Sequence, residues 1–361
     1  MLLTRLANEV GISETAHKRF KSYQCDRTQR VMVNLATSHE ISFTCGVPQG
    51  SVLGPILFSL YTRQLGNLIE GHNVSRKLFA DDTQLYKSFH PDGASMDLAV
   101  KDVEECCRNI KTWMTQNRLK LNDEKTEVIL CGSETSRQKV SLDSIQVGSS
   151  QIEISTVVRD LGLLVDSNLT MVPHVSSVVK SCYFHLRTLG QLRPQLNRKT
   201  ANAVAVSLIQ SRLDFCNGCL LGLPQLQVQR LQKVQNTAAR IVTKSRKSDH
   251  ITPVLRDLHW LPVQKRLEYK ALPLVFACME GSAPEYLCDL IPRHIPSRGL
   301  RSAGRSLLQV PSRERHRRKT LGARSFESVA PALWNSLPQS LRECGSRDSF
   351  RRQLKTHLFR H

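Results

Sequence analysis

Hydrophobic and polar positions in the first third of the chain follow two periods, one typical of strands and one typical of helices. Residues 78–80 and 85–89 are short apolar runs that contain aromatic side chains, and they predict two strands joined by a turn. Residues 96–118 repeat apolar side chains at alternating spacings of four and three, which predicts an amphipathic helix. Residues 126–130 alternate as a strand with one covered face does. We expect a small antiparallel sheet with covering helices.

The rest of the chain has a mainly helical period. Helices are predicted at residues 174–189, 199–213, 224–243 and 263–279. The inward face predicted for the third helix consists of Leu231, Val234, Ala238 and Ile241. After Pro292 the helical period is lost until a short helix at 349–359. These patterns predict an α+β protein, and a length of 361 residues favours two or three units.

Two adjacent carboxylates, Asp81 and Asp82, stand at the bend between the two predicted strands. Successive strand side chains point to opposite faces, so only one aspartate faces a given centre unless the turn re-aims the other. Carboxylate oxygens bind hard divalent cations, and in two-metal phosphoryl transfer such cations clamp the attacking and leaving oxygens. The ordinary alternative is a solvated turn, because turn geometry by itself favours aspartate.

A segment rich in glycine and proline lies upstream of these aspartates. Its sequence is Gly46-Val47-Pro48-Gln49-Gly50-Ser51-Val52-Leu53-Gly54-Pro55-Ile56-Leu57-Phe58. The glycines let the backbone approach a ligand closely, while Pro48 and Pro55 fix the start of a turn or of a helix. Residues 56–61 are expected to begin a buried helix. Taken by itself, the segment favours an ordinary loop before a core helix.

Together, residues 46–58 and the Phe79-Ala80-Asp81-Asp82 turn resemble reverse transcriptases of LINE-type, non-long-terminal-repeat retrotransposons, in the group of jockey and chicken-repeat elements. The resemblance implies a partial polymerase palm, with an antiparallel sheet and covering helices, followed by a mostly helical thumb and carboxy-terminal region. It implies that Asp81 and Asp82 hold catalytic Mg²⁺ or Mn²⁺ for RNA-templated DNA synthesis. It also implies that the nucleotide and template base lie against Gln49, Gly50, Ser51 and Phe79.

The resemblance continues through most of the chain. Asn122 and Lys125 precede the strand predicted at 126–130 as in the family's next palm element, and Lys125 is implied to neutralise phosphate charge or supply a proton. A solvated lysine before a strand is the alternative. The later similarity rests on residues 159–174, 211–217 and 258–263. The expected units are a truncated palm at 1–131, a palm-to-thumb connection at 132–173, a helical thumb-like region at 174–291 and a basic tail with a short terminal helix at 292–361.

One part of the family pattern does not occur upstream of Gly46. Polymerases of this family carry another catalytic aspartate in an F-D-x-x-x-H-like motif on an earlier strand. The acidic residues in this stretch are Glu9, Glu14, Asp26 and Glu40, and Asp26 is expected to be a surface turn residue. Two neighbouring carboxylates under-coordinate two divalent cations, so we expect weak metal binding and no polymerisation by this chain alone.

Positive charge is concentrated in the second part of the chain. Residues 1–130 contain 16 Lys and Arg against 15 Asp and Glu, whereas residues 131–361 contain 35 against 16. A basic field attracts phosphates through counterion release without reading sequence, so RNA and DNA are the expected partners. The alternatives are a solvated linker and a solvated helix face. The candidate cations are Arg230, Lys233 and Arg240 on the predicted helix 224–243, Lys244 directly after it, and Arg313, Arg315, Arg317, Arg318 and Lys319 in the basic run.

The eleven cysteines do not have the spacing of a metal framework. Cys216 and Cys219 form a lone C-x-x-C pair, so reduced thiols in an intracellular protein are expected. The amino terminus lacks the apolar core of a signal peptide, and no run of apolar residues is long enough to cross a membrane. We expect a protein of the nucleus or cytoplasm, with the run at 313–319 as a possible nuclear-localisation patch.

Two classes of function follow from these observations. In the first, the chain is a fragment of a LINE-type reverse transcriptase whose lineage chemistry is two-metal nucleotidyl transfer. In the second, it is a non-enzymatic nucleic-acid-binding protein derived from a retrotransposon, which binds through its basic carboxy-terminal half. The upstream coding sequence discriminates between them, because an in-frame F-D motif there would supply the other carboxylate.

Overall fold

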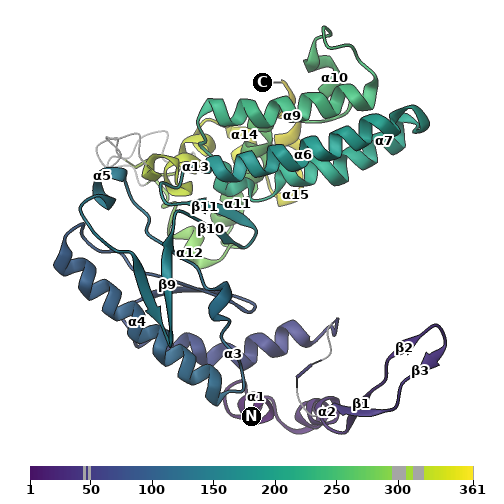
Figure 1. Cartoon of the computed structure of the whole chain (residues 1–361). Coiled ribbons are helices and arrows are strands. Elements are labelled where there is room, and N and C mark those ends of the chain that lie inside the picture. Colours follow the sequence, from purple (N-terminus) through teal and green to yellow (C-terminus); the bar gives the residue numbers. More distant parts are fainter. Residues whose placement is uncertain (44–45, 48–49, 295–305, 312–320, 361) are drawn as a thin grey trace. The chain divides into compact units, whose positions relative to one another are not determined.

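A computed structural model describes residues 1–43, 46–47, 50–294, 306–311 and 321–360 (Figure 1). It confirms the α+β class, because helices predominate and the strands pair in small antiparallel sheets. The chain divides into two compact units, one of residues 1–128 with 135–154, and one of residues 129–134 with 155–361. No helix in the described residues is both long and apolar enough to cross a membrane.

The first unit begins with two helices and a nested pair of hairpins. Helices α1 (Leu2–Asn8) and α2 (Glu14–Gln24) precede the antiparallel pair β1 (Arg27–Gln29) and β4 (Ile41–Phe43). The shorter pair β2 (Met32–Val33) and β3 (Ala36–Thr37) lies between them along the chain. Figure 1 shows these four strands as one long, narrow arm.

Two long helices form the core of the first unit with a hairpin. Helix α3 (Gly54–Glu70) and helix α4 (Gly93–Gln116) flank the antiparallel strands β5 (Ser75–Phe79) and β6 (Asp82–Tyr86). The amphipathic helix expected at 96–118 is confirmed by α4, whose amino terminus is capped by the Asp92 side chain. Helix α3 is confirmed as well, although Ile56 at its start is exposed. The buried side chains of this core are Leu65, Ile69, Val74, Cys106, Ile110 and Trp113.

The strand expected at 126–130 is shorter in the structure. A 3-10 turn, η1 (Asp123–Lys125), comes first, and strand β7 contains only Val128–Ile129. The polar stretch at 132–150 contains α5 (Glu134–Arg137) and β8 (Ser144–Val147), and β8 pairs with β9 (Ser150–Ser155). This stretch contributes one strand of a hairpin.

The second unit begins with a hairpin and continues as packed helices. Strands β10 (Val157–Asp160) and β11 (Leu163–Asp166) pair around Gly162, whose φ of +86° is accessible to glycine. The Asp166 carboxylate accepts the Met171 amide at 2.8 Å and both the amide and the hydroxyl of Thr170. These bonds fix the start of helix α6 (Val172–Leu192).

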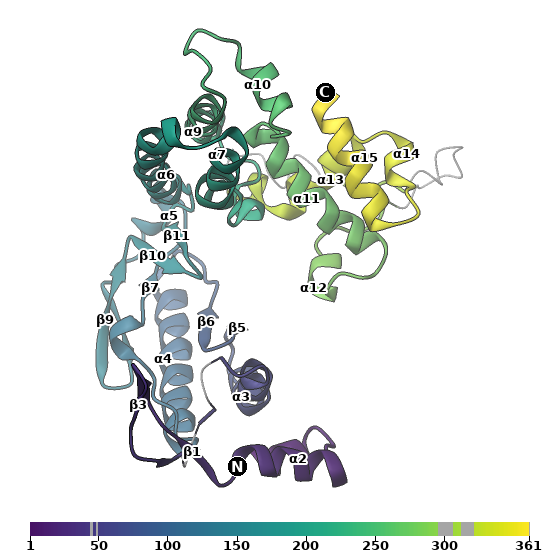
Figure 2. The ribbon, with the colours of Figure 1, turned by 90° about the vertical axis from the view of Figure 1, so that its right-hand side faces the viewer.

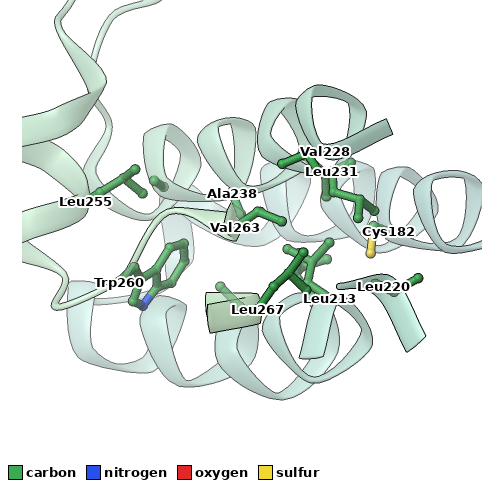
Figure 3. Close-up of a cluster of buried hydrophobic side chains, with 14 of the residues drawn as sticks. Cys182, Leu213, Leu220, Val228, Leu231, Ala238, Leu255, Trp260, Val263 and Leu267 are labelled. Atoms are coloured by element: carbon green, nitrogen blue, oxygen red, sulfur yellow. The ribbon is translucent and has the colours of Figure 1, made fainter. Parts of the chain in front are cut away.

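Helices α6, α9 (Gln225–Thr243) and α11 (Val263–Met279) surround the larger hydrophobic core of the second unit (Figure 3). The predicted inward face of α9 is confirmed at Leu231, Val234 and Ala238, while Ile241 is only partly buried. The elements of this layer are η2 (Arg193–Gln195), α7 (Arg198–Ala205), the π-helical turn η3 (Val206–Gln210), α8 (Ser211–Asp214), η4 (Asn217–Leu220), α9 (Gln225–Thr243), α10 (Ile251–Asp257) and α11 (Val263–Met279).

Helices α12 (Glu285–Cys288) and η5 (Leu321–Arg324) lead to three further helices, α13 (Phe326–Asn335), α14 (Gln339–Arg342) and α15 (Arg347–Arg360). The expectation that helical order is lost until residue 349 is therefore wrong for α13 and α14. Their periodicity was obscured because Pro331 lies inside α13 and Pro338 precedes α14. A second core joins α11, α13 and α15, in which the rings of Phe276 and Phe350 stack at 4.6 Å and Trp334 is buried.

Candidate catalytic hairpin and nucleic-acid surface

The two aspartates lie at the tip of the β5–β6 hairpin. Phe79 pairs directly with Asp82, which leaves Ala80 and Asp81 as a two-residue loop. Ala80 has a φ of +52°, as the first loop residue of such tight hairpins requires. This conformation costs a non-glycine residue about 1–2 kcal/mol. The sequence interpretation placed both aspartates in the turn, whereas the structure places Asp82 in β6 and Asp81 in the loop.

The register separates an exposed face of the hairpin from a buried one. Leu85 of β6 packs against the first core. Residues opposite and two positions apart share a face, so Phe79, Asp82 and Gln84 lie on the face away from Leu85. Phe79 is 63% exposed, and both aspartates are exposed. Neither aspartate has a hydrogen-bond or ion-pair partner within the described part of the chain.

Two ion pairs hold the base of this hairpin on the helices. Arg76 of β5 pairs with Glu70 at the end of α3. Its guanidinium lies over Gly66, where an added Cβ would approach it to 2.9 Å. Lys87, just after β6, pairs with Asp102 of α4 at 2.9 Å. The helices therefore fix the hairpin base and leave the aspartate tip in solvent.

Side chains of α2 and β1 contact the glycine-rich segment on both sides of residues 48–49. Arg27 of β1 donates to the Gly46 carbonyl at 2.7 Å, and its guanidinium lies 4.6 Å from the Phe43 ring. Tyr23 of α2 shares a hydrogen bond with the Ser51 hydroxyl. Gly46 and Gly50 have φ values of +79° and +83°, which agrees with their expected backbone role. Gln49 and Pro48 lie outside the described residues.

Lys125 lies just before strand β7 and Asp26 lies in a surface bend, as the sequence suggested. Lys125 ends η1 with an exposed side chain that has no partner among the described residues. Asp26 is exposed in the bend between α2 and β1, with a φ of +53°, as expected for a surface turn residue. Metal-ligating side chains do not gather in groups of three or more anywhere in the described parts.

The four cations singled out near helix α9 divide into two kinds. Arg230 donates to Gln227 and to the Ser176 hydroxyl, both within the helical layer. Arg240 donates to two backbone carbonyls of the loop that leads to α10, so its guanidinium holds that loop. Lys233 and Lys244 are exposed. The basic-run residues Arg313, Arg315, Arg317, Arg318 and Lys319 lie outside the described residues.

The similar segments at 211–217 and 258–263 contain residues that make internal contacts, which the sequence alone did not predict. Asp214 accepts two hydrogen bonds from the Arg266 guanidinium, one of them at 2.8 Å. Trp260 is buried in the larger core, where Figure 3 shows it beside the helices. Burial raises the pKa of the Cys216 and Cys219 thiols, which disfavours their reactive thiolate forms. The sequence gave no signal for this partly buried ion pair, because Arg266 lies far from Asp214 along the chain.

Comparison with known proteins places these motifs in one family. Residues 8–163 match the model of the reverse transcriptase (RNA-dependent DNA polymerase) family. The matched stretch includes the glycine-rich segment, the aspartate hairpin and Lys125, so the motifs that suggested the family lie inside it.

Three relatives from Drosophila melanogaster are similar over longer stretches. The probable RNA-directed DNA polymerase from transposon BS is 28% identical over 272 residues, which cover 68% of this chain and 28% of that protein. The corresponding protein from transposon X-element is 25% identical over 66% of this chain and 26% of its own length. The RNA-directed DNA polymerase from mobile element jockey is 24% identical over 54% of this chain and 21% of its own length.

The chain thus spans between 21% and 28% of the length of these three curated relatives. All three relatives are named as polymerases of mobile elements, which agrees with the family of the matched domain. In its motifs and in these matches, the chain is similar to the reverse transcriptases of LINE-type, non-long-terminal-repeat retrotransposons.

Proposed function

We propose that the β5–β6 hairpin is the metal-binding element of RNA-templated DNA synthesis in this fragment. The observation that supports it most is the exposed tip, where Asp81 and Asp82 extend beyond a base clamped by Arg76 and Lys87. Because ion pairs hold the base of the hairpin and its tip is exposed, the two carboxylates can bind a ligand without rearrangement of the core. Asp81 would hold the cation and Asp82 would support it.

The residues present fit a hard divalent cation in ligand type. Mg²⁺ is commonly bound by one or two carboxylates together with substrate phosphates and water, and Mn²⁺ also accepts oxygen ligands. Such a cation supplies charge stabilisation at the attacking and leaving oxygens of phosphoryl transfer. Two adjacent carboxylates are fewer than a two-metal site uses, so we expect binding of Mg²⁺ or Mn²⁺ by this chain to be weak.

Nucleotide and template contacts form the second part of the proposal. Phe79 lies on the same hairpin face as Asp82, and its exposed ring is available for stacking against a base or sugar. The Gly50 backbone and the Ser51 hydroxyl lie in the segment held by Arg27 and Tyr23. We infer that Gln49, Gly50 and Ser51 border the nucleotide–template pair, and that Lys125 neutralises phosphate charge.

A second candidate function is binding of nucleic acid without catalysis. It is supported by the excess of 35 Lys and Arg over 16 Asp and Glu in residues 131–361. Phosphate contacts carry no base information, so the binding of RNA and DNA should depend little on sequence. On α9 and at its carboxy-terminal cap, Lys233 and Lys244 are better placed for such contacts than Arg230 and Arg240, whose donors are used internally. Such partners fit an intracellular location.

Primer extension on an RNA template tests whether the two hairpin aspartates are enough for catalysis by this chain. We expect the 361-residue chain to incorporate no nucleotide with either Mg²⁺ or Mn²⁺, because a further carboxylate shared by both cations is needed. Template-dependent incorporation that disappears in Asp81→Asn would overturn this expectation and would show that another residue of the chain supplies the ligand. Asp26→Asn is the matched control, since it removes one exposed carboxylate of the same unit.

A further inference from the structure

A groove between α14 and α15 lies apart from the residues assigned above. Its volume is ≈ 570 Å³. One wall is a stripe along α15, and the other wall consists of the start of α14 with the proline before it. Figure 2 shows the two helices next to each other in the second unit. The residues of α15 that line the groove are Ser349, Arg352, Gln353, Thr356, His357 and Arg360.

The groove stripe follows from the periodicity of α15. Its residues are spaced by three, one, three, one and three positions, so they share one face of the helix. The core face of the same helix carries Phe350, Leu354 and Leu358, which pack against α11 and α13. That packing fixes the rotation of α15 and turns the polar stripe toward α14. The packing therefore determines which face of α15 borders the groove, while Arg352, Gln353, Thr356 and Arg360 are themselves exposed.

The chemistry of the groove favours an anion. Its lining contains two guanidinium groups, three hydroxyls, an imidazole and an amide, and no lining residue is a carboxylate. The Gln353 amide donates to Ser349 at 3.0 Å and the Thr356 hydroxyl donates to the Arg352 carbonyl at 3.1 Å. Neither the Arg352 nor the Arg360 guanidinium has a protein partner in the described part of the chain. Unpaired guanidinium groups bind phosphates in a bidentate manner.

We propose that this groove binds the phosphodiester backbone of RNA or DNA, as a site separate from the catalytic hairpin. Arg352 and Arg360 are eight residues apart, which corresponds to about 12 Å along a helix. Two guanidinium groups at that separation can contact two different phosphates of one strand, whereas a single small phosphate ion cannot reach both. The surface around them is also basic, because Arg351 and Lys355 lie on the same helix. The proposal rests on the proposed function only in taking nucleic acid as the ligand.

A charge-matched pair of variants tests the groove in the full-length chain. Arg352→Gln with Arg360→Gln removes two groove cations, whereas Arg351→Gln with Lys355→Gln removes two exposed cations of α15 outside the groove. Fluorescence anisotropy with a labelled single-stranded RNA of mixed sequence measures the affinity of both double variants at several salt concentrations. The groove variant should lose roughly tenfold in affinity, about the value of one charge-assisted hydrogen bond. Its salt slope should flatten by about 1.4, or 0.7 for each phosphate contact.

Three further measurements distinguish a specific groove from general charge attraction and from misfolding. Arg352→Lys with Arg360→Lys should restore the salt slope while recovering only part of the affinity, because lysine keeps the charge and loses the bidentate geometry. Equal losses in the groove and control variants would overturn the proposal, as would displacement of the RNA by inorganic phosphate at low concentration or by polyglutamate as effectively as by unlabelled RNA. Circular dichroism checks that each variant is folded. Cation binding at Asp81 and Asp82 is measured separately, so a failed groove and a failed hairpin give different results.

Discussion

Lys111 of α4 forms an ion pair with Asp123 of η1 at 2.7 Å, and this contact fastens the segment that carries Lys125 to the long helix. The Ser150 hydroxyl donates to the same carboxylate oxygen at 3.1 Å. The Lys111 side chain also lies over Gly148, where an added Cβ would meet it at 2.4 Å. Three segments that are separate in the sequence thus converge on one carboxylate.

Removal of Lys111 should raise the pKa of Asp123. The hydrogen bond from Lys111 is the main cause that lowers the pKa of this carboxyl below its ordinary value. A lowered pKa means that the contact stabilises the fold above the ordinary carboxyl range and that this contribution is lost as pH falls through the lowered pKa. Carboxyl NMR titration should show the Asp123 pKa moving back toward its ordinary value in Lys111→Met and staying low in Lys111→Arg. An unchanged pKa in Lys111→Met would contradict the assignment.

The β5–β6 hairpin should open more readily than helix α9. The hairpin is a two-stranded sheet whose tip is exposed, whereas α9 carries buried side chains along its whole length. Native-state hydrogen exchange should therefore be faster at residues 78–86 than at residues 225–243. Slower exchange in the hairpin would show that a partner or a further strand covers it.

Truncation of Phe350 should destabilise the second unit by about 3–5 kcal/mol, the usual cost of replacing a core phenylalanine by alanine. Phe350 is fully buried and stacks on Phe276, so its removal leaves a cavity between α11 and α15. Urea unfolding gives the free energy. Phe359→Ala is a control from the same helix, because this side chain is only partly buried and should cost less. Similar costs for both variants would mean that α15 is loosely packed.

The basic run should contribute to nucleic-acid binding evenly across sequences. Replacing Arg315, Arg317, Arg318 and Lys319 by alanine is expected to weaken RNA and DNA binding alike and to flatten the salt slope by a few units, because released counterions set that slope. Filter binding at several salt concentrations measures both quantities. If affinity and slope were retained, the run would be a solvated linker.

Sequence patterns predicted elements whose side chains follow one clear period. Helix α4 and most of the α9 inward face were found because their apolar residues repeat every three or four positions over several turns. The hairpin was found because two aromatic runs flank adjacent aspartates. The register of its two strands was not predicted. Phe79 pairs with Asp82, which requires Ala80 to adopt a left-handed backbone conformation, and an alanine gives no sign of this in the sequence.

Internal partners of charged residues could not be predicted from the chain. Arg230 and Arg240 have the spacing of surface cations, yet their donors bond to Ser176 and to loop carbonyls that only the fold brings near. The groove beside α15 was not predicted for a similar reason. One of its walls is α14, and Pro338 before this helix made the segment look like a loop in the sequence. A contact between distant segments has no periodic signal.

Manganese binding at the hairpin tests the central claim most directly. Electron paramagnetic resonance of Mn²⁺ titrated with the full chain should show a weak site that is lost in Asp81→Asn with Asp82→Asn. The control, Asp26→Asn with Asp97→Asn, removes two exposed carboxylates of the same unit and should leave that site intact. Equal Mn²⁺ binding by the wild type and by the hairpin variant would contradict the account, because the two aspartates would then be an ordinary solvated turn.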